Sequence, residues 1–130
     1  MKTLPFWDLS KNDLLNNELL LKKEYNRVIP FILNKKEENG SFGSVEDTFW
    51  SLLSLYLMQK LNLIDKEKIN RFIFNFRSPK GGFFSTQEEY PDVSTTFYAI
   101  SCLHLLDLDL NEDEKRITFN YLIESITKED

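Results

Sequence analysis

Few side chains in this sequence are of types that carry chemistry, and their spacing limits what they can do together. The chain has one histidine, His104, and one cysteine, Cys102. On a helix, two residues separated by two positions point about 200° apart around the axis, so these two cannot bind one metal ion. A single histidine also excludes a multi-histidine metal site within the chain. We expect both side chains to belong to the core or to line a pocket.

Asp92 is the carboxylate that most needs an interpretation, because it stands between a glycine-rich loop and an apolar run. The stretch that contains it reads PKGGFFSTQEEYPDVSTTFYAI, from Pro79 to Ile100. Asp92 is either an acid or metal ligand in a catalytic loop, or the N-cap of the helix that follows. Aspartate accepts hydrogen bonds from the free N–H groups of a first helical turn. Its place directly before an apolar run therefore favours the cap, and catalysis is the alternative.

Length and composition narrow the classes of protein to consider. The 130 residues suffice for one domain, 1–130, and are 42% hydrophobic with a net charge of −5. The chain has no block of Lys and Arg, so we expect no nucleic-acid partner. No apolar run is long enough to span a membrane, and the first residues do not read as a signal peptide. One cysteine suits a reducing compartment, so we expect a cytoplasmic protein.

The chain contains an internal repeat, which is its clearest indication of fold. Residues 28–42 align with 69–83 at an offset of 41, and residues 44–58 align with 92–106 at an offset of 48. Identical pairs are Phe31 and Phe72, Ile32 and Ile73, Asn34 and Asn75, Gly40 and Gly81, Phe42 and Phe83, Val45 and Val93, Thr48 and Thr96, Phe49 and Phe97, Leu55 and Leu103, and Leu57 and Leu105. The offset grows because the second loop is longer.

Each repeat, about 28–61 and about 69–107, is predicted to be a helix, a glycine turn and a second helix. All four glycines lie in the two equivalent loops, where they permit a positive φ, and the phenylalanine after each turn should be buried beneath it. N-capping residues mark the helix starts: Ser10, Ser44, Asp65, Asp92 and Asn111. The expected helices are 10–25, 27–38, 45–60, 66–76, 93–107 and 112–127, with Pro30 in the first turn of the second.

Two kinds of helix alternate along the chain. The 45–60 and 93–107 segments are apolar nearly all round, as in an inner layer, whereas 66–76 and 112–127 are amphipathic. No segment alternates as a strand would. We therefore predict an all-α domain of about three stacked hairpins, in which helices 10–25 and 112–127 flank the two repeats.

The motifs NGSFG and GGFF…PDVSTTFYAISCLHLL resemble the repeats of protein prenyltransferase β-subunits and of squalene and terpenoid cyclases. The resemblance covers about Val28 to Leu106. It implies an (α/α)6 toroid of six hairpins, of which this chain would supply about half a ring. Because that fold hosts several chemistries, the resemblance implies the fold more firmly than an activity.

The zinc-bearing loop of prenyltransferases can be followed through this resemblance residue by residue. Asp92 matches the family's aspartate, but Ser94 stands in place of its cysteine and Thr95 in place of a zinc-binding histidine. Thr86 and Glu89 replace an arginine and a lysine. A zinc site needs about three protein ligands, and a diphosphate needs cationic donors. We therefore expect no metal, no other cofactor and no zinc-dependent prenyl transfer within this chain, while its status as an enzyme stays open.

Functions of different classes follow from this interpretation. We favour a non-catalytic module that binds an apolar group, a peptide or a partner chain on a concave aromatic face. The expected binding residues are Phe49, Trp50, Tyr56, Phe97, Tyr98 and His104. The alternative is a subunit of an isoprenoid transferase or terpene cyclase whose active site forms only on assembly, and a third is a structural half-ring. In each case open apolar edges predict a homodimer or a partner protein that completes the toroid.

Overall fold

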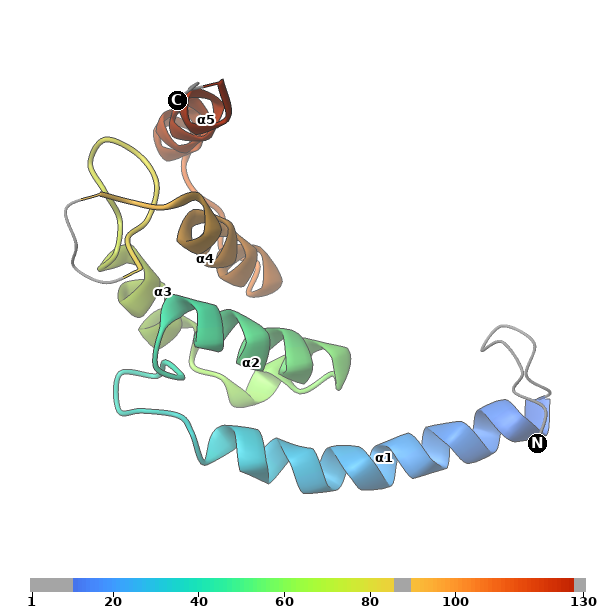
Figure 1. The fold of residues 1–130 in the computed structure, drawn as a ribbon. Coiled ribbons are helices and arrows are strands. Elements are labelled where there is room, and N and C mark those ends of the chain that lie inside the picture. Colours follow the sequence, from blue (N-terminus) through green and yellow to red (C-terminus); the bar gives the residue numbers. More distant parts are fainter. Residues whose placement is uncertain (1–10, 86–89, 128–130) are drawn as a thin grey trace. The chain divides into compact units, whose positions relative to one another are not determined.

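A computed structural model describes residues 11–85 and 90–127, with side chains from Lys22 onward. This part of the chain is helical (Figure 1). Its elements are α1 (Lys11–Leu33), α2 (Val45–Leu57), the 3-10 turn η2 (Leu61–Leu63), α3 (Lys66–Phe74), α4 (Val93–Leu105) and α5 (Glu112–Thr127). The described residues contain two isolated β-bridges and no strand. The prediction of an all-α fold is confirmed. Ser10, Thr86 and Glu89 lie outside the described residues.

The chain divides into two units, Met1–Asn34 and Lys35–Asp130, and the first contains α1. The prediction of separate helices at 10–25 and 27–38 was wrong, because α1 runs without a break to Leu33 with Pro30 inside it. A proline inside a helix removes one N–H donor, which led us to place it in a first turn. The helical hydrogen bonding continues past it, since the N–H of Asn34 donates to the carbonyl of Pro30 at 2.9 Å.

Capping side chains fix the starts of the four α-helices in the second unit. The Oγ of Ser44 accepts from the N–H of Asp47 at 3.0 Å, and the carboxylate of Asp92 accepts from the N–H of Thr95 at 2.7 Å. Asp65 caps α3, and Asn111 accepts from the first turn of α5. These helices begin at the predicted residues because a cap acts within its own turn.

The helix ends also repeat, although they come two to three residues earlier than predicted for α2 and α4. Gln59 follows α2 with a φ of 58°, and Asp107 follows α4 with a φ of 56°. A left-handed residue ends an α-helix and turns the chain. The next N–H groups then bond back into the helix, from Lys60 to Leu55 and from Leu108 to Leu103.

Each glycine turn is tied to the inner helix that follows it. The N–H of Phe42 donates to Oγ1 of Thr48 at 3.0 Å, and the N–H of Phe83 donates to Oγ1 of Thr96 at 2.9 Å. Both phenylalanines and both threonines are buried, which confirms the prediction that these rings lie beneath the turns. We call Thr48 and Thr96 the turn threonines.

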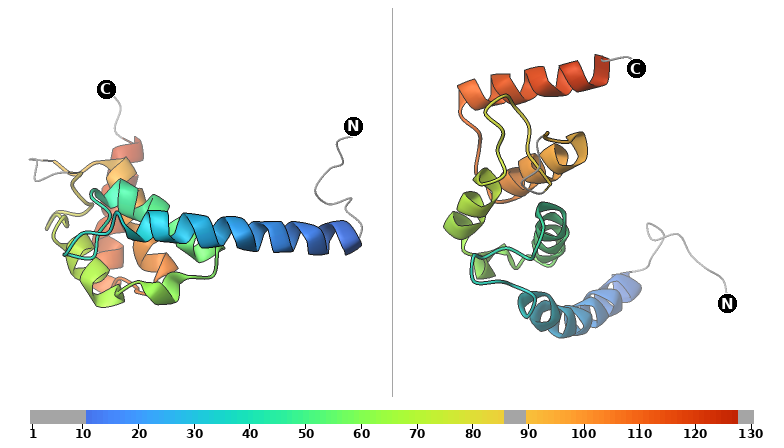
Figure 2. Two further views of the ribbon diagram at one scale, coloured as in Figure 1. Left: turned by 90° about the horizontal axis from the view of Figure 1, so that it is seen from below. Right: turned by 60° about the vertical axis from the view of Figure 1, so that its left-hand side comes forward.

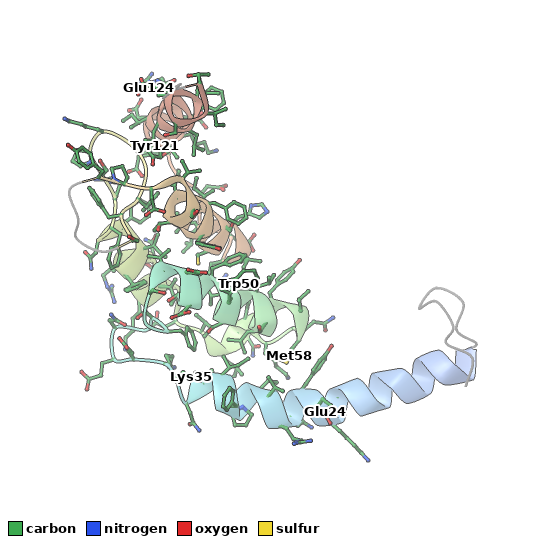
Figure 3. The ribbon with its side chains drawn as sticks, viewed as in Figure 1. Glu24, Lys35, Trp50, Met58, Tyr121 and Glu124 are labelled. Carbon is green, nitrogen blue, oxygen red and sulfur yellow. The ribbon has the colours of Figure 1, made fainter. Side chains whose placement is uncertain are left out.

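The glycines of the turns lie directly against a helix of the next repeat. A Cβ on Gly40 would come 2.7 Å from Cβ of Lys68 on α3. A Cβ on Gly81 would come 2.8 Å from the carbonyl oxygen of Ile117 and from Cβ of Tyr121 on α5. Figure 3 labels Tyr121 on this helix. Both glycines have a positive φ, of 87° and 109°, as predicted. The first turn therefore rests on α3 and the second on α5.

Helices α2 and α4 pack on one another and form the centre of the second unit (Figure 2). Several side chains that the repeat shares are buried on these two helices, among them Val45, Phe49 and Leu55 of α2 and Leu103 of α4. Fully buried side chains include Leu52, Leu55, Ile69, Ile73, Phe83, Ala99, Cys102 and Leu103. Helix α5 differs, since Thr118 is its one buried residue among those described.

Candidate functional site

Four rings from α2 and α4 form an aromatic cluster, composed of Phe49, Trp50, Phe97 and Tyr98. The Phe49 ring lies at its centre, with centroid distances of 4.9 Å to Trp50, 5.4 Å to Tyr98 and 6.0 Å to Phe97. Tyr98 also contacts Phe97 at 5.6 Å and Trp50 at 6.1 Å. All five of these pairs are edge-on or tilted, and the charge distribution of aromatic rings favours such arrangements over face-to-face stacking.

The cluster is anchored in the core and open on its outer side. Phe49 is buried, whereas Trp50 is 50% exposed and Phe97 is also exposed. Trp50 lies where α2 faces α4 (Figure 3). Large exposed rings that are held in place by a buried neighbour are suited to binding, because little side-chain entropy remains to be lost.

An open pocket of about 560 Å³ adjoins this cluster. Its lining residues are Phe49 of α2; Val93, Phe97, Ile100, Ser101, His104 and Leu105 of α4; and Leu122 of α5. We call it the α4 pocket, since α4 supplies most of the lining. Six of these eight side chains are apolar, and Ser101 and His104 are polar.

The structure brings most of the predicted binding residues together. Phe49, Phe97 and His104 line the α4 pocket, and Trp50 and Tyr98 adjoin it through their ring contacts with Phe49. Tyr56 is exposed further along α2 and is not among the lining residues.

The predicted set lacked five of the lining residues: Val93, Ile100, Ser101, Leu105 and Leu122. Val93, Phe97, Ile100 and His104 follow a helical spacing of four, three and four residues, so the stripe on α4 was readable once the helix was assigned. Leu122 could not be found in this way, because its place in the lining depends on how α5 packs against α4.

Asp92 is used as a cap. One carboxylate oxygen accepts from the N–H of Thr95 at 2.7 Å, and the other accepts from the Thr95 hydroxyl at 2.9 Å. This confirms the predicted cap. Both oxygens of the carboxylate are therefore occupied by the first turn of α4.

Cys102 is fully buried, as predicted for a core residue. Burial raises the pKa of its thiol to about 12, because an apolar surrounding disfavours the thiolate. The thiolate is the form that binds metals and attacks electrophiles. Cys102 therefore serves as a small apolar side chain in the core.

Two further findings concern the described part of the chain. Its histidine, cysteine and acidic side chains form no group of three or more that could hold a metal ion. None of its helices is long and apolar enough to cross a membrane.

The sequence model of the prenyltransferase α/α toroid domain matches residues 2–127. The chain belongs to this family. One curated relative, the geranylgeranyl transferase type-2 subunit beta of Schizosaccharomyces pombe, is 33% identical over 63 residues, which are 48% of this chain and 20% of the relative. The chain thus matches about a fifth of the length of that relative. No solved structure matches.

The prenyltransferase toroid fold is built from repeated units, and the repeated features of this chain belong to one such unit. In this chain the unit consists of a glycine turn, a buried phenylalanine, a turn threonine and an apolar helix with an N-cap. The α4 pocket lies on the second copy of that helix, α4.

Proposed function

We propose that this toroid module binds the hydrocarbon chain of an isoprenoid in the α4 pocket, without carrying out zinc-dependent prenyl transfer itself. The observation that carries the proposal is the lining, in which six apolar side chains surround an open volume of about 560 Å³. Small-molecule sites measure roughly 300–1,000 Å³ and are mostly apolar with a few polar groups. The relative named for geranylgeranyl transfer supports an isoprenoid among apolar ligands.

The residue types near the pocket support binding rather than transfer. A diphosphate leaving group needs cationic donors such as Arg and Lys, and none lines the α4 pocket. The carboxylate of Asp92 accepts two hydrogen bonds from Thr95 and so caps α4. Cys102 is a buried thiol whose pKa is raised by burial. Asp92 is the residue that matches the aspartate of the family's zinc loop, and Cys102 is the one thiol of the chain that could bind a metal or attack an electrophile.

Trp50 provides a direct test of isoprenoid binding. The chain has two tryptophans, Trp7 and Trp50, so a Trp7→Phe background leaves Trp50 as the one fluorescent indole. Its ring lies 4.9 Å from Phe49, which lines the pocket. We expect saturable fluorescence changes on titration with geranylgeraniol, measured below the micellar concentration of the lipid.

Phe97→Ala and Phe119→Ala make a matched pair for this titration. The two rings are 58% and 61% exposed, but only Phe97 lines the pocket. Loss of the Phe97 ring should weaken binding about tenfold or more, because a large apolar contact is removed. At a concentration that keeps the chain monomeric, Phe119→Ala should leave the Kd unchanged. Equal effects of the two variants, or a signal that never saturates, would exclude specific binding in the α4 pocket.

We also propose that a second copy of the chain covers the outer face of α5. Phe119, Ile123 and Ile126, which we call the α5 stripe, fall on one side of this helix and are between 42% and 74% exposed. The helix beneath the first turn, α3, has the apolar helix α4 after it in the chain, whereas α5, beneath the second turn, has none after it among the described residues. A repeat from another copy would supply that neighbour.

Light scattering at micromolar concentration tests this assembly. We expect a mass above the 15.4 kDa of one chain, reduced to 15.4 kDa by Ile123→Asp, which places a charge in the stripe. Asn120→Asp, at an exposed position on the same helix outside the stripe, is the control and should not dissociate the assembly. A folded 15.4 kDa species from the unmodified chain would show that no second copy is needed.

A further inference from the structure

The two polar side chains of the α4 pocket lie close together on one helix. Ser101 and His104 are three residues apart on α4, so they share a face of the helix, and both line the pocket. His104 is exposed and Ser101 is half-buried, so the polar side of the lining meets solvent. Between them they offer a hydroxyl and an imidazole, which can each donate and accept a hydrogen bond.

The rest of the lining extends away from this polar pair. Val93 lies eleven residues before His104 on the same helix, a separation of about 16 Å at 1.5 Å per residue. Phe97 and Ile100 lie between them. The shape therefore matches a long apolar chain with one polar end.

The negative end of α4 and the acidic segment that follows it in the chain disfavour an anionic head on such a ligand. The pair lies in the last two turns of α4, where the helix dipole presents its negative end. From Asp107 to Arg116 the chain carries five acidic residues and two basic ones. Both basic residues already face acids, Lys115 with Glu112 at 3.6 Å and Arg116 with Asp113 at 3.2 Å.

We infer that the α4 pocket selects an isoprenoid alcohol, whose uncharged hydroxyl head bonds to Ser101 and His104 while its hydrocarbon chain lies along Phe97 and Ile100. This inference rests on the proposed function and names the ligand class for the same site. A hydroxyl can accept from one of the two side chains and donate to the other. A diphosphate in the same place would meet the negative end of α4, and the described lining of the pocket includes no Lys or Arg to balance it.

Three probes that share one hydrocarbon chain and differ in their head group separate the contribution of the head to binding from that of the hydrocarbon chain. Geranylgeraniol has a donor, its methyl ether has none, and geranylgeranyl diphosphate carries charge. In the Trp50 assay we expect the alcohol to bind about three to tenfold more tightly than the ether, the range of one net hydrogen bond. The diphosphate should bind more weakly than the alcohol.

The double variant Ser101→Ala/His104→Ala should bind the alcohol no better than the ether, and its Kd for the alcohol should rise more than its Kd for the ether, which can accept a hydrogen bond but cannot donate one. His104→Gln keeps a neutral donor and acceptor and should retain most of the preference for the alcohol, which distinguishes hydrogen bonding from charge. Circular dichroism melting of each variant checks that the fold is intact.

The outcomes distinguish the two levels of the proposal. If all probes bind and the double variant changes nothing, the head contact is wrong while hydrocarbon binding stands. If the diphosphate binds more tightly than the alcohol, the selection of an uncharged head is wrong. If no probe binds, both the pocket function and the alcohol inference fall.

Discussion

The two glycine turns of the second unit are held in the same way, but the helices beneath them differ in how far their apolar side chains are covered. Each turn buries a phenylalanine whose N–H donates to a turn threonine. The first turn rests on α3, whose Ile69, Phe72 and Ile73 are buried. The second rests on α5, whose stripe is exposed.

This difference shows what each repeat provides for itself and what it takes from its neighbour. The turn, the threonine and the cap all come from within one repeat, so both copies have all three. Burial of the helix beneath the turn differs between the copies, since the apolar side chains of α3 are covered and those of the α5 stripe are exposed. Stability should therefore be concentrated around α3, and association or ligand binding around α4 and α5.

The largest expected effect compares an isoleucine on each of these two helices. Ile73→Ala on α3 removes a fully buried side chain and should lower the free energy of unfolding by about 2–5 kcal/mol. Ile123→Ala on α5 should change the stability of the monomer by less than about 0.5 kcal/mol, because that side chain is already in contact with solvent. Urea denaturation at a concentration that keeps the chain monomeric measures both. Similar losses at the two sites would contradict the contrast between α3 and α5.

A somewhat smaller loss of stability is expected when a glycine of either turn is replaced by alanine, and the loss should be larger in the second turn than in the first. Gly81→Ala forces a Cβ against the backbone carbonyl of Ile117 as well as a positive φ, and should cost more than about 2 kcal/mol. Gly43→Ala meets a positive φ of 105° but no atom closer than 3.7 Å, so backbone strain alone should cost about 1–2 kcal/mol. Thermal melting of the two variants compares them. Equal shifts in Tm would show that the second turn does not rest tightly on α5.

Features that depend on neighbouring residues could be predicted from the sequence, whereas contacts between residues distant in the chain could not. The starts of α2 and α4 were predicted to the residue, because the Ser44 and Asp92 caps act within one turn of the chain. The identity of Thr48 and Thr96 was visible in the repeat, yet their bonds to the glycine turns were not, since these join residues brought together by folding. The contribution of Leu122 to the pocket was hidden for the same reason.

The length of α1 was missed because of a competing local rule. Proline is tolerated in the first turn of a helix, so Pro30 was compatible with the predicted helix 27–38 and gave no sign that one helix continues through it. The structure continues the helix through it and loses only the bond that the missing N–H would have made. The repeat alignment, which begins at residue 28, also predicted a helix that starts near residue 27.

The turn threonines test the hydrogen bond that ties each glycine turn to the helix after it within the same repeat. Thr48→Val and Thr96→Val keep the shape of the side chain but leave a buried N–H, of Phe42 or Phe83, without its acceptor. Each should lower the free energy of unfolding by about 1–3 kcal/mol, with the larger loss at Thr96, whose hydroxyl also donates to the carbonyl oxygen of Asp92 at 2.8 Å. Hydrogen exchange of the two phenylalanine amides, followed by NMR, should accelerate only at the repeat that carries the substitution. Acceleration at both would mean that the turns are coupled.

The smallest expected effect concerns the caps, where the two repeats use different residues for one task. Asp92→Ala should cost about 0.5–2 kcal/mol, because the N–H and hydroxyl of Thr95 lose their acceptors, and Asp92→Ser should cost less because serine can still cap. Serine is also what the first repeat uses at the equivalent position, Ser44. The reciprocal change, Ser44→Asp, should leave stability nearly unchanged. If isoprenoid binding or any activity of the chain were lost in Asp92→Ser while its melting temperature stayed the same, Asp92 would have a chemical role beyond the cap.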